Sequence, residues 1–172
     1  AAGEFDEAVR IWEGLLGEVS VKTALGVRAN LAVAYRELGD LPSAWYNLTW
    51  YLKHSKNKDL TAGEELQLLE KDLTGAGFVR IAIACEPAKS VIYLGKVEHG
   101  KPYDCPLAWW MTPGKTWVTV SSKGYQTKSA ELDIRERGDD TAHHIRLTEI
   151  APRLGELVVD GKGRAIQVFL DG

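Results

Sequence analysis

The sequence lacks a long apolar run, and it lacks an excess of charge of either sign. Its longest apolar stretches fall well short of the roughly 18 consecutive residues that a membrane-spanning helix needs, so we expect no membrane span. Lysine and arginine number 21 against 24 aspartate and glutamate residues, which gives a net charge of −3. Binding to a phosphate backbone requires a local surplus of basic side chains. Because no segment has one, we exclude nucleic acid as a partner.

Motifs that carry catalysis are also missing. The sequence contains neither HExxH nor GxSxG, and it has no phosphate-loop spacing. His143 and His144 are neighbours on an expected strand and so point to opposite faces, while His54 and His99 lie in other segments. Asp139-Asp140 follows a glycine, which is typical of a polar turn, although calcium binding is the other interpretation. We therefore expect a non-enzymatic protein with no metal or other cofactor.

The sequence has only two cysteines, Cys85 and Cys105, 20 positions apart. Both lie beside strand-like sequence, so they are candidates for a disulfide, which would indicate an oxidising compartment. A disulfide that closes a loop of this length stabilises a small module by about 3 kcal/mol when its effect is treated as chain entropy. The alternative is a pair of small buried hydrophobic side chains in a reducing cytosol.

The pattern of residue types in 78–94 recurs in 154–170, 76 positions later and without a gap. Matched positions keep their chemical type, as in Ile81 with Leu157, and the apolar residues alternate as a half-buried strand requires. We interpret this as one complete β-module and the start of a truncated second copy. Repeated modules of this size without catalytic groups favour an interaction protein.

The first part of the chain has the apolar period of amphipathic helices. This period runs through 4–17 and 22–56, and Gly39-Asp40 breaks the second run. A further amphipathic helix follows, with Thr61 as its expected N-cap and Gly75-Ala76-Gly77 as its end. The pattern predicts an antiparallel helical array.

One turn and helix start occurs twice in this segment. Gly3-Glu4-Phe5-Asp6-Glu7-Ala8 and Gly39-Asp40-Leu41-Pro42-Ser43-Ala44 stand 36 residues apart. In tetratricopeptide repeats, a Tyr, a Gly and an Ala spaced like Tyr35, Gly39 and Ala44 let two helices approach closely, and residues 1–56 resemble that family.

This resemblance implies a site on the helices. Repeats of this kind bind peptides along the concave face made by the first helix of each pair, here 22–38. The residues expected to be exposed on that face are Asn30, Val33, Arg36 and Glu37. The alternative is an ordinary solvated surface that binds nothing.

From Phe78 onward the apolar period changes to two. The strand candidates are 78–85, 90–95, 105–111, 116–122, 126–134 and 142–148, with glycine and proline turns between them. Many short strands joined by such turns favour a small antiparallel β-sandwich.

The order of these strands and turns resembles the PEGA domain, a bacterial β-sandwich module. The residues that carry the likeness are Pro87, Val91-Ile92-Tyr93-Leu94, Cys105-Pro106-Leu107, Pro113-Gly114-Lys115, Val118-Thr119-Val120, Gly124-Tyr125 and Leu132-Asp133-Ile134. The sequence departs from the family at Pro87-Ala88-Lys89-Ser90, where the family has the tetrad that names it. The resemblance implies a bacterial protein whose sandwich acts as a spacer or a docking surface.

Two tryptophans are predicted to pair across a hairpin. If its turn spans Thr112 to Lys115, Trp110 lies opposite Trp117. Both then point away from the core, which receives Leu107, Trp109, Met111, Val118 and Val120. An exposed aromatic pair commonly marks a contact surface for a sugar ring, a peptide or a neighbouring module. The alternative is that the helical array or the second module covers the pair.

These patterns together predict an α+β chain with a helical array over 1–76, a sandwich over 77–149 and the start of a second sandwich over 154–172, which we expect to form an ordered hairpin. The expected function is a periplasmic or cell-surface scaffold of a bacterial envelope complex that recruits a protein partner. A carbohydrate or cell-wall binding module that uses the two tryptophans is the main alternative, and a cytoplasmic adaptor is a third. Because Ala1-Ala2-Gly3 reads like the interior of a helical hairpin, we expect a fragment whose signal peptide or anchor was removed or lies outside it.

Overall fold

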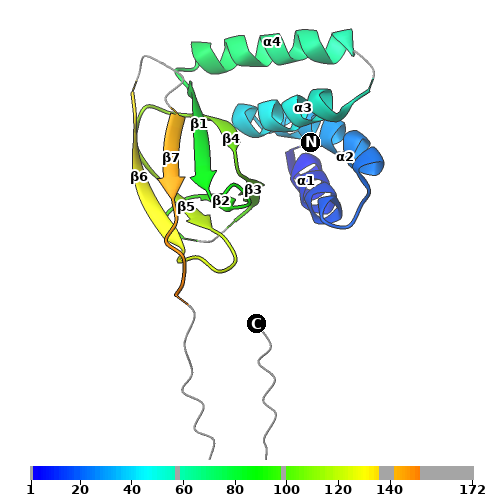
Figure 1. The fold of residues 1–172 in the computed structure, drawn as a ribbon. Helices are drawn as coiled ribbons and strands as arrows, with labels where there is room; N and C mark the ends of the chain where they lie inside the picture. The colour runs from blue at the N-terminus through cyan, green and yellow to red at the C-terminus, as the bar shows by residue number, and fades with distance from the viewer. Residues whose placement is uncertain (1, 57–58, 98–99, 136–141, 152–172) are drawn as a thin grey trace, which may run out of the picture.

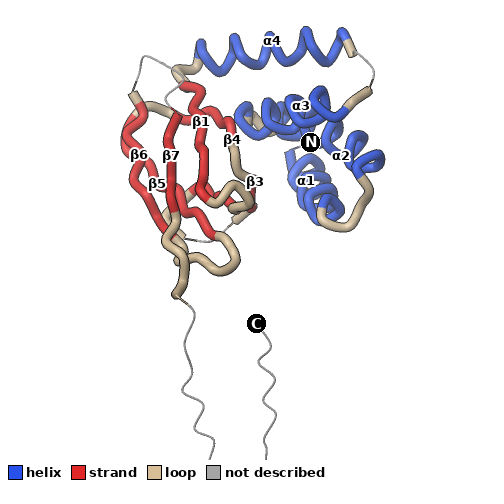
Figure 2. Tube along the Cα trace, in the orientation of Figure 1, coloured by secondary structure: helices blue, strands red, loops and turns tan. Residues whose placement is uncertain are grey.

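The computed structural model of the chain describes residues 2–56, 59–97, 100–135 and 142–151. Within these ranges the helices come first and the strands follow, so the chain is α+β as predicted (Figure 1; Figure 2). The helices are α1 (Ala2–Leu16), α2 (Val21–Glu37), α3 (Leu41–His54) and α4 (Leu60–Gly75). The strands are β1 (Val79–Glu86), β2 (Val91–Leu94), β3 (Pro102–Asp104), β4 (Leu107–Met111), β5 (Gly114–Ser121), β6 (Lys128–Ile134) and β7 (Ala142–Arg146). The expected second hairpin, 154–172, lies outside the described residues.

Polar side chains begin three of the helices. The Ser20 side chain accepts a hydrogen bond from the backbone N–H of Thr23, and Asp40 and Asp59 do the same for α3 and α4. The predicted cap Thr61 is wrong, because Asp59 already accepts from the N–H of Ala62 at 3.0 Å and Thr61 lies within the first turn of α4. A carboxylate at this place also interacts favourably with the helix dipole.

The two predicted turns before α1 and α3 differ. Gly39 adopts a φ of 78°, and the N–H of Asp40 donates to the carbonyl of Tyr35, so α2 ends in a tight turn. Gly3 and Glu4 instead lie inside α1, which starts at Ala2. Each helix then packs against the next along the chain. Ala44 on α3 has no exposed surface, and its small side chain allows close packing of the helices around it.

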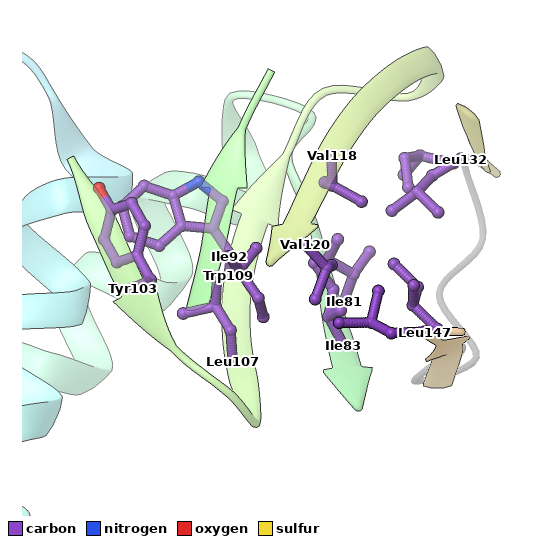
Figure 3. Packing of buried hydrophobic residues seen from close by; sticks show 12 residues of the cluster. Ile81, Ile83, Ile92, Tyr103, Leu107, Trp109, Val118, Val120, Leu132 and Leu147 are labelled. Carbon is purple, nitrogen blue, oxygen red and sulfur yellow. The ribbon is translucent and has the colours of Figure 1, made fainter. Parts of the chain in front are cut away.

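The strands form two sheets that pack face to face. One sheet has the order β4-β1-β7 and the other β3-β2-β5-β6. Ile81 and Ile83 from the first sheet and Val118 and Val120 from the second lie in one buried core, which Figure 3 shows between the sheets. Every strand pair is antiparallel except β1 with β7, which is parallel. Among the described residues the sequence prediction missed one strand, β3, which has only three residues.

The predicted hairpin between 105–111 and 116–122 is wrong. Trp110 on β4 lies opposite Arg80 of β1, whereas Trp117 on β5 lies opposite Glu131 of β6. The chain around Pro113 therefore crosses from one sheet to the other. The predicted faces hold nevertheless: Leu107, Trp109, Val118 and Val120 are buried, and Met111 packs against the same core.

A disulfide joins Cys85, at the end of β1, to Cys105, just before β4, with the two Cα atoms 6.1 Å apart. Of the two alternatives that the sequence left open for these cysteines, the structure therefore has the disulfide. The bond fastens the chain that leaves β3 to the central strand of the three-stranded sheet.

Candidate functional site

An open groove of about 440 Å³ lies between α2 and α4, with α3 beneath it. Its lining residues include Val33, Arg36 and Glu37 of α2, Leu48 and Tyr51 of α3, and Ala62, Glu65 and Leu69 of α4. The four residues predicted on this face, Asn30, Val33, Arg36 and Glu37, are all exposed. Three of them line the groove, and Asn30 is not among its lining residues.

The middle of the groove is apolar. Val33 keeps 55% of its surface exposed, and the buried side chains of Leu48 and Leu69 reach the same hollow from α3 and α4. An exposed valine beside buried leucines gives a partner side chain an apolar surface to cover, and covering it removes that surface from water.

Charged side chains lie across the groove and along its sides. Arg36 Nη1 lies 3.5 Å from Glu65 Oε1, so an ion pair connects α2 with α4. Both side chains are well exposed, so the pair adds at most about 1 kcal/mol to stability. The Tyr51 hydroxyl donates to Asp59 Oδ2 at 2.9 Å. The backbone N–H of Ala62, together with Tyr51, holds the pKa of Asp59 below its usual value, so this carboxylate stays ionised.

The sandwich packs on a different side of α3 from the groove. Trp45 of α3 meets Trp110 of β4 edge to face, with ring centroids 6.1 Å apart, and the fully buried Leu73 of α4 completes the contact. The Trp45 Nε1–H donates to Glu70 Oε1 at 3.0 Å. Trp110 is therefore only 8% exposed. Its burial under the helices is the alternative that the sequence left open.

A second contact between helices and sandwich is also aromatic. Tyr46 of α3 packs edge to face on Tyr103 of β3, with ring centroids 5.1 Å apart, and lies 5.5 Å from the ring of Trp109. Figure 3 shows Tyr103 and Trp109 at the end of the sandwich core nearest the helices. The apolar core of the sandwich thus extends to Tyr46 of α3.

A lysine lies inside this aromatic contact. Lys101 Nζ lies 2.5 Å from Glu13 Oε1 of α1 and 5.5 Å from the ring centre of Tyr35. Glu13 also accepts a hydrogen bond from the Tyr35 hydroxyl. Burial lowers the pKa of Lys101 and the ion pair with Glu13 opposes that shift, while burial raises the pKa of Tyr35. Sequence reasoning missed this cluster, because no local pattern links position 13 with position 101.

Trp117 lies apart from Trp110. It is half-buried on the outer face of β5, where Lys96 Nζ lies 4.9 Å from its ring centre. The Thr119 hydroxyl on the same face donates to the carbonyl of Gly95 at 2.9 Å, so the chain after β2 folds over this face. The predicted platform of two exposed tryptophans is therefore wrong, and the carbohydrate site that depended on it has no structural basis.

The histidines take separate places. His143 and His144 lie on opposite faces of β7 as predicted, the first half-buried and the second exposed. Burial lowers the pKa of His143, while His54 stacks on Trp50 at 3.9 Å between ring centres. Across the described part of the chain, no three His, Cys, Asp or Glu side chains converge as metal ligands would. Asp139-Asp140 and His99 fall outside the described residues.

Comparisons with known proteins assign no family. A scan against protein-family models found no family that matches the chain, and a search of curated proteins found no match. Among the helices of the described residues, none is both long enough and apolar enough to span a membrane.

Proposed function

We propose that the chain is a non-enzymatic scaffold that binds a peptide segment of a partner protein in the groove between α2 and α4. The helices would belong to a tetratricopeptide-like array and the strands to a PEGA-like sandwich. The tight turn at Gly39 and the order of the strands along the module support these two resemblances.

The main support for the proposal is that the sandwich covers one side of the helices and leaves the groove on another side open. The sandwich contacts α3 through Trp45 and Tyr46, and it contacts α1 through Glu13. The groove lined by Val33 stays open to solvent. An apolar hollow with fixed charged groups at its sides is a general feature of peptide-binding grooves.

The sandwich would act as a spacer that holds the groove at a set orientation. Its contacts with the helices are buried aromatic side chains and a partly buried ion pair, which resist rotation better than an exposed linker does. The disulfide between Cys85 and Cys105 supports an oxidising compartment, since such bonds are rare in the reducing cytosol. We therefore assign the scaffold to a bacterial envelope or surface-associated complex.

A peptide selection tests the groove. Peptides from a displayed random library are selected on the full chain, and their affinities are measured for two variants. Val33→Asp puts a charge in the middle of the groove, where Val33 is 55% exposed. Leu68→Asp is the matched control, because Leu68 on α4 is 52% exposed and does not line the groove.

We expect Val33→Asp to weaken the selected peptides at least about tenfold, since a buried unpaired charge is costly, and Leu68→Asp to leave them unchanged. Equal losses in the two variants, or a selection that yields no peptide, would contradict the proposal. Circular dichroism of both variants checks that each retains the parent fold.

A further inference from the structure

The charged side chains that line the groove between α2 and α4 are mostly acidic. They are Glu37 at the end of α2, Asp59 at the start of α4 and Glu65 on α4, and among the described residues that line the groove Arg36 is the only base. Arg36 already forms an ion pair with Glu65 across the groove. The carboxylates of Glu37 and Asp59 therefore give the groove a negative charge that no lining base balances.

Glu37 is the more available of these two carboxylates. It is exposed, and it takes part in none of the ion pairs among the described residues. As the last residue of α2 it also lies at the negative end of the helix dipole, which favours a cation at the same place. Asp59 already accepts hydrogen bonds from Ala62 and Tyr51, but each carboxylate oxygen can accept another. Two separate positions in the groove can therefore accept a basic side chain.

These two positions lie on either side of the apolar middle of the groove. Helices joined by short turns are antiparallel, so α2 and α4 both run opposite to α3 and hence in the same direction. Arg36 and Glu65 are level with each other, because they form an ion pair. Asp59 precedes Glu65 by six residues, about 9 Å along the axis of α4, so it lies level with Ala29 rather than with the end of α2. The exposed Val33 therefore lies between the two acidic positions.

The spacing of these groups matches that of side chains in an extended peptide. Val33 and Glu37 are one helical turn apart, about 6 Å along the axis of α2. In an extended chain, side chains two positions apart point to the same side and are separated by about 7 Å. When one side chain of such a peptide covers Val33, the side chain two positions along reaches Glu37. The side chain two positions in the other direction approaches Asp59.

We propose that the groove selects a basic peptide, with one apolar side chain over Val33 and a lysine or arginine two positions away on each side. The pattern is symmetric, so either direction of the peptide satisfies it. This inference rests on the proposed function and names the class of peptide that the groove takes. The peptide belongs to another protein rather than to a second copy, because the chain has a net charge of −3 and an acidic surface is complementary to a basic one.

Two displayed peptide libraries test the proposal on the full chain. Both have random flanks around a fixed apolar centre, and the positions two before and two after the centre are lysine in one library and glutamate in the other. The affinities of the selected peptides are then measured at low and high salt for the parent chain, Glu37→Gln, Glu37→Lys and Glu18→Gln. Glu18 is the matched control, because it is exposed in the turn between α1 and α2 and does not line the groove.

We expect only the lysine library to yield peptides. At low salt Glu37→Gln should weaken their binding about threefold and Glu37→Lys about tenfold, whereas Glu18→Gln should leave it unchanged. High salt should reduce these differences, because Glu37 is exposed to solvent. Circular dichroism checks the fold of each variant, and a lysine at the end of α2 is compatible with the helix dipole.

Equal yields from the two libraries, or equal losses in Glu37→Gln and Glu18→Gln, would overturn the selectivity for basic peptides and leave peptide binding itself standing. A failure of both libraries would contradict the proposed function as well. Tighter binding of the selected peptides to Arg164→Glu would overturn the proposal too, because the segment 154–170 of the chain itself, which lies outside the described residues, would then compete for the groove. So would sedimentation showing a dimer that Val33→Asp dissociates, since the occupant would be a second copy.

Discussion

Replacing Trp110 with alanine is expected to destabilise the chain by about 3 kcal/mol. The indole packs among Trp45, Leu73 and the partly buried Phe78, so truncation leaves a cavity where the sandwich meets the helices. An exposed tryptophan, which is one of the two interpretations that the sequence left open here, would change stability by only about 0.5 kcal/mol on replacement. The two descriptions of Trp110 therefore differ by a measurable amount.

Three contributions set this magnitude. Truncation of a buried tryptophan to alanine costs about 3 to 5 kcal/mol. The edge-to-face contact with Trp45 contributes about 0.5 to 1.5 kcal/mol beyond the buried area. Against this, Trp110 Nε1 has no hydrogen-bond partner among the described residues, and removal of an unsatisfied buried donor returns about 1 kcal/mol or more. The last contribution places the net cost at the low end.

The assay is equilibrium urea denaturation followed by circular dichroism. Trp110→Phe keeps a ring and removes the unpaired N–H, so it should cost no more than about 1.5 kcal/mol. Trp110→Ala and Trp45→Ala, alone and together, form a double-mutant cycle with an expected coupling of about 1 kcal/mol. Trp117→Ala is the control, since Trp117 is only half-buried and should cost about 1 to 2 kcal/mol.

A loss below about 1 kcal/mol in Trp110→Ala would refute the reasoning, because it would mean that Trp110 is not buried between β4 and α3. Zero coupling with Trp45 would refute the direct contact even if the loss were large. A larger loss in Trp117→Ala than in Trp110→Ala would mean that the two residues have been assigned the wrong environments.

Two further predictions concern the disulfide and the buried tyrosines. Reduction of the bond between Cys85 and Cys105 should lower the free energy of unfolding by roughly 3 kcal/mol, and identical denaturation midpoints with and without reductant would contradict this. Burial raises the pKa of Tyr35 and Tyr103, so the folded chain keeps protons that the unfolded chain loses near pH 10. The two tyrosines therefore stabilise the folded chain fully below that pH, and above it the free energy of unfolding falls by up to about 1.4 kcal/mol per pH unit for each tyrosine. The lowered pKa of Lys101 has a smaller effect of opposite sign on the free energy of unfolding. Denaturation between about pH 9 and 11 measures this slope, which Tyr103→Phe should reduce; an unchanged slope would contradict the assignment.

The sequence predicted the elements well because their signals are local. The period of the apolar residues located the helices, and the glycine turns separated the strands. The error at the start of α4 was also local: Asp59 and Thr61 are both acceptable caps, and only the backbone geometry shows that Asp59 accepts from Ala62.

The pairing of strands was harder, because it depends on contacts that are distant in the sequence. Alternation correctly assigned Trp109 to the core and Trp110 to the outer face. It does not specify the neighbouring strand, and the turn at Pro113-Gly114 is compatible with a hairpin and equally with a crossing between sheets. What covers the outer face of Trp110 depends on a helix some 60 residues earlier, and no periodicity encodes that contact.

The candidate site was likewise predicted only in part. The resemblance to tetratricopeptide repeats implied that Val33 and Arg36 on α2 are exposed, and both are. The groove that they line also needs Glu65 and Leu69 from α4, which the sequence did not connect with them. The ion pair of Lys101 with a glutamate of α1 had no signal, since neither residue belongs to a motif.

The parallel pair of β1 and β7 has a consequence for how the sandwich is made. The first strand of the module cannot complete its sheet until the last strand is available, because Ala82 of β1 pairs with Ala142 of β7. Native pairing of β1 on that side is impossible until a ribosome has released nearly the whole module, whereas the helices need only local contacts to form. During synthesis the helical part would thus fold first and expose Trp45 and Tyr46. Strands β3 and β4 would then pack on these two side chains before β7 completes the three-stranded sheet.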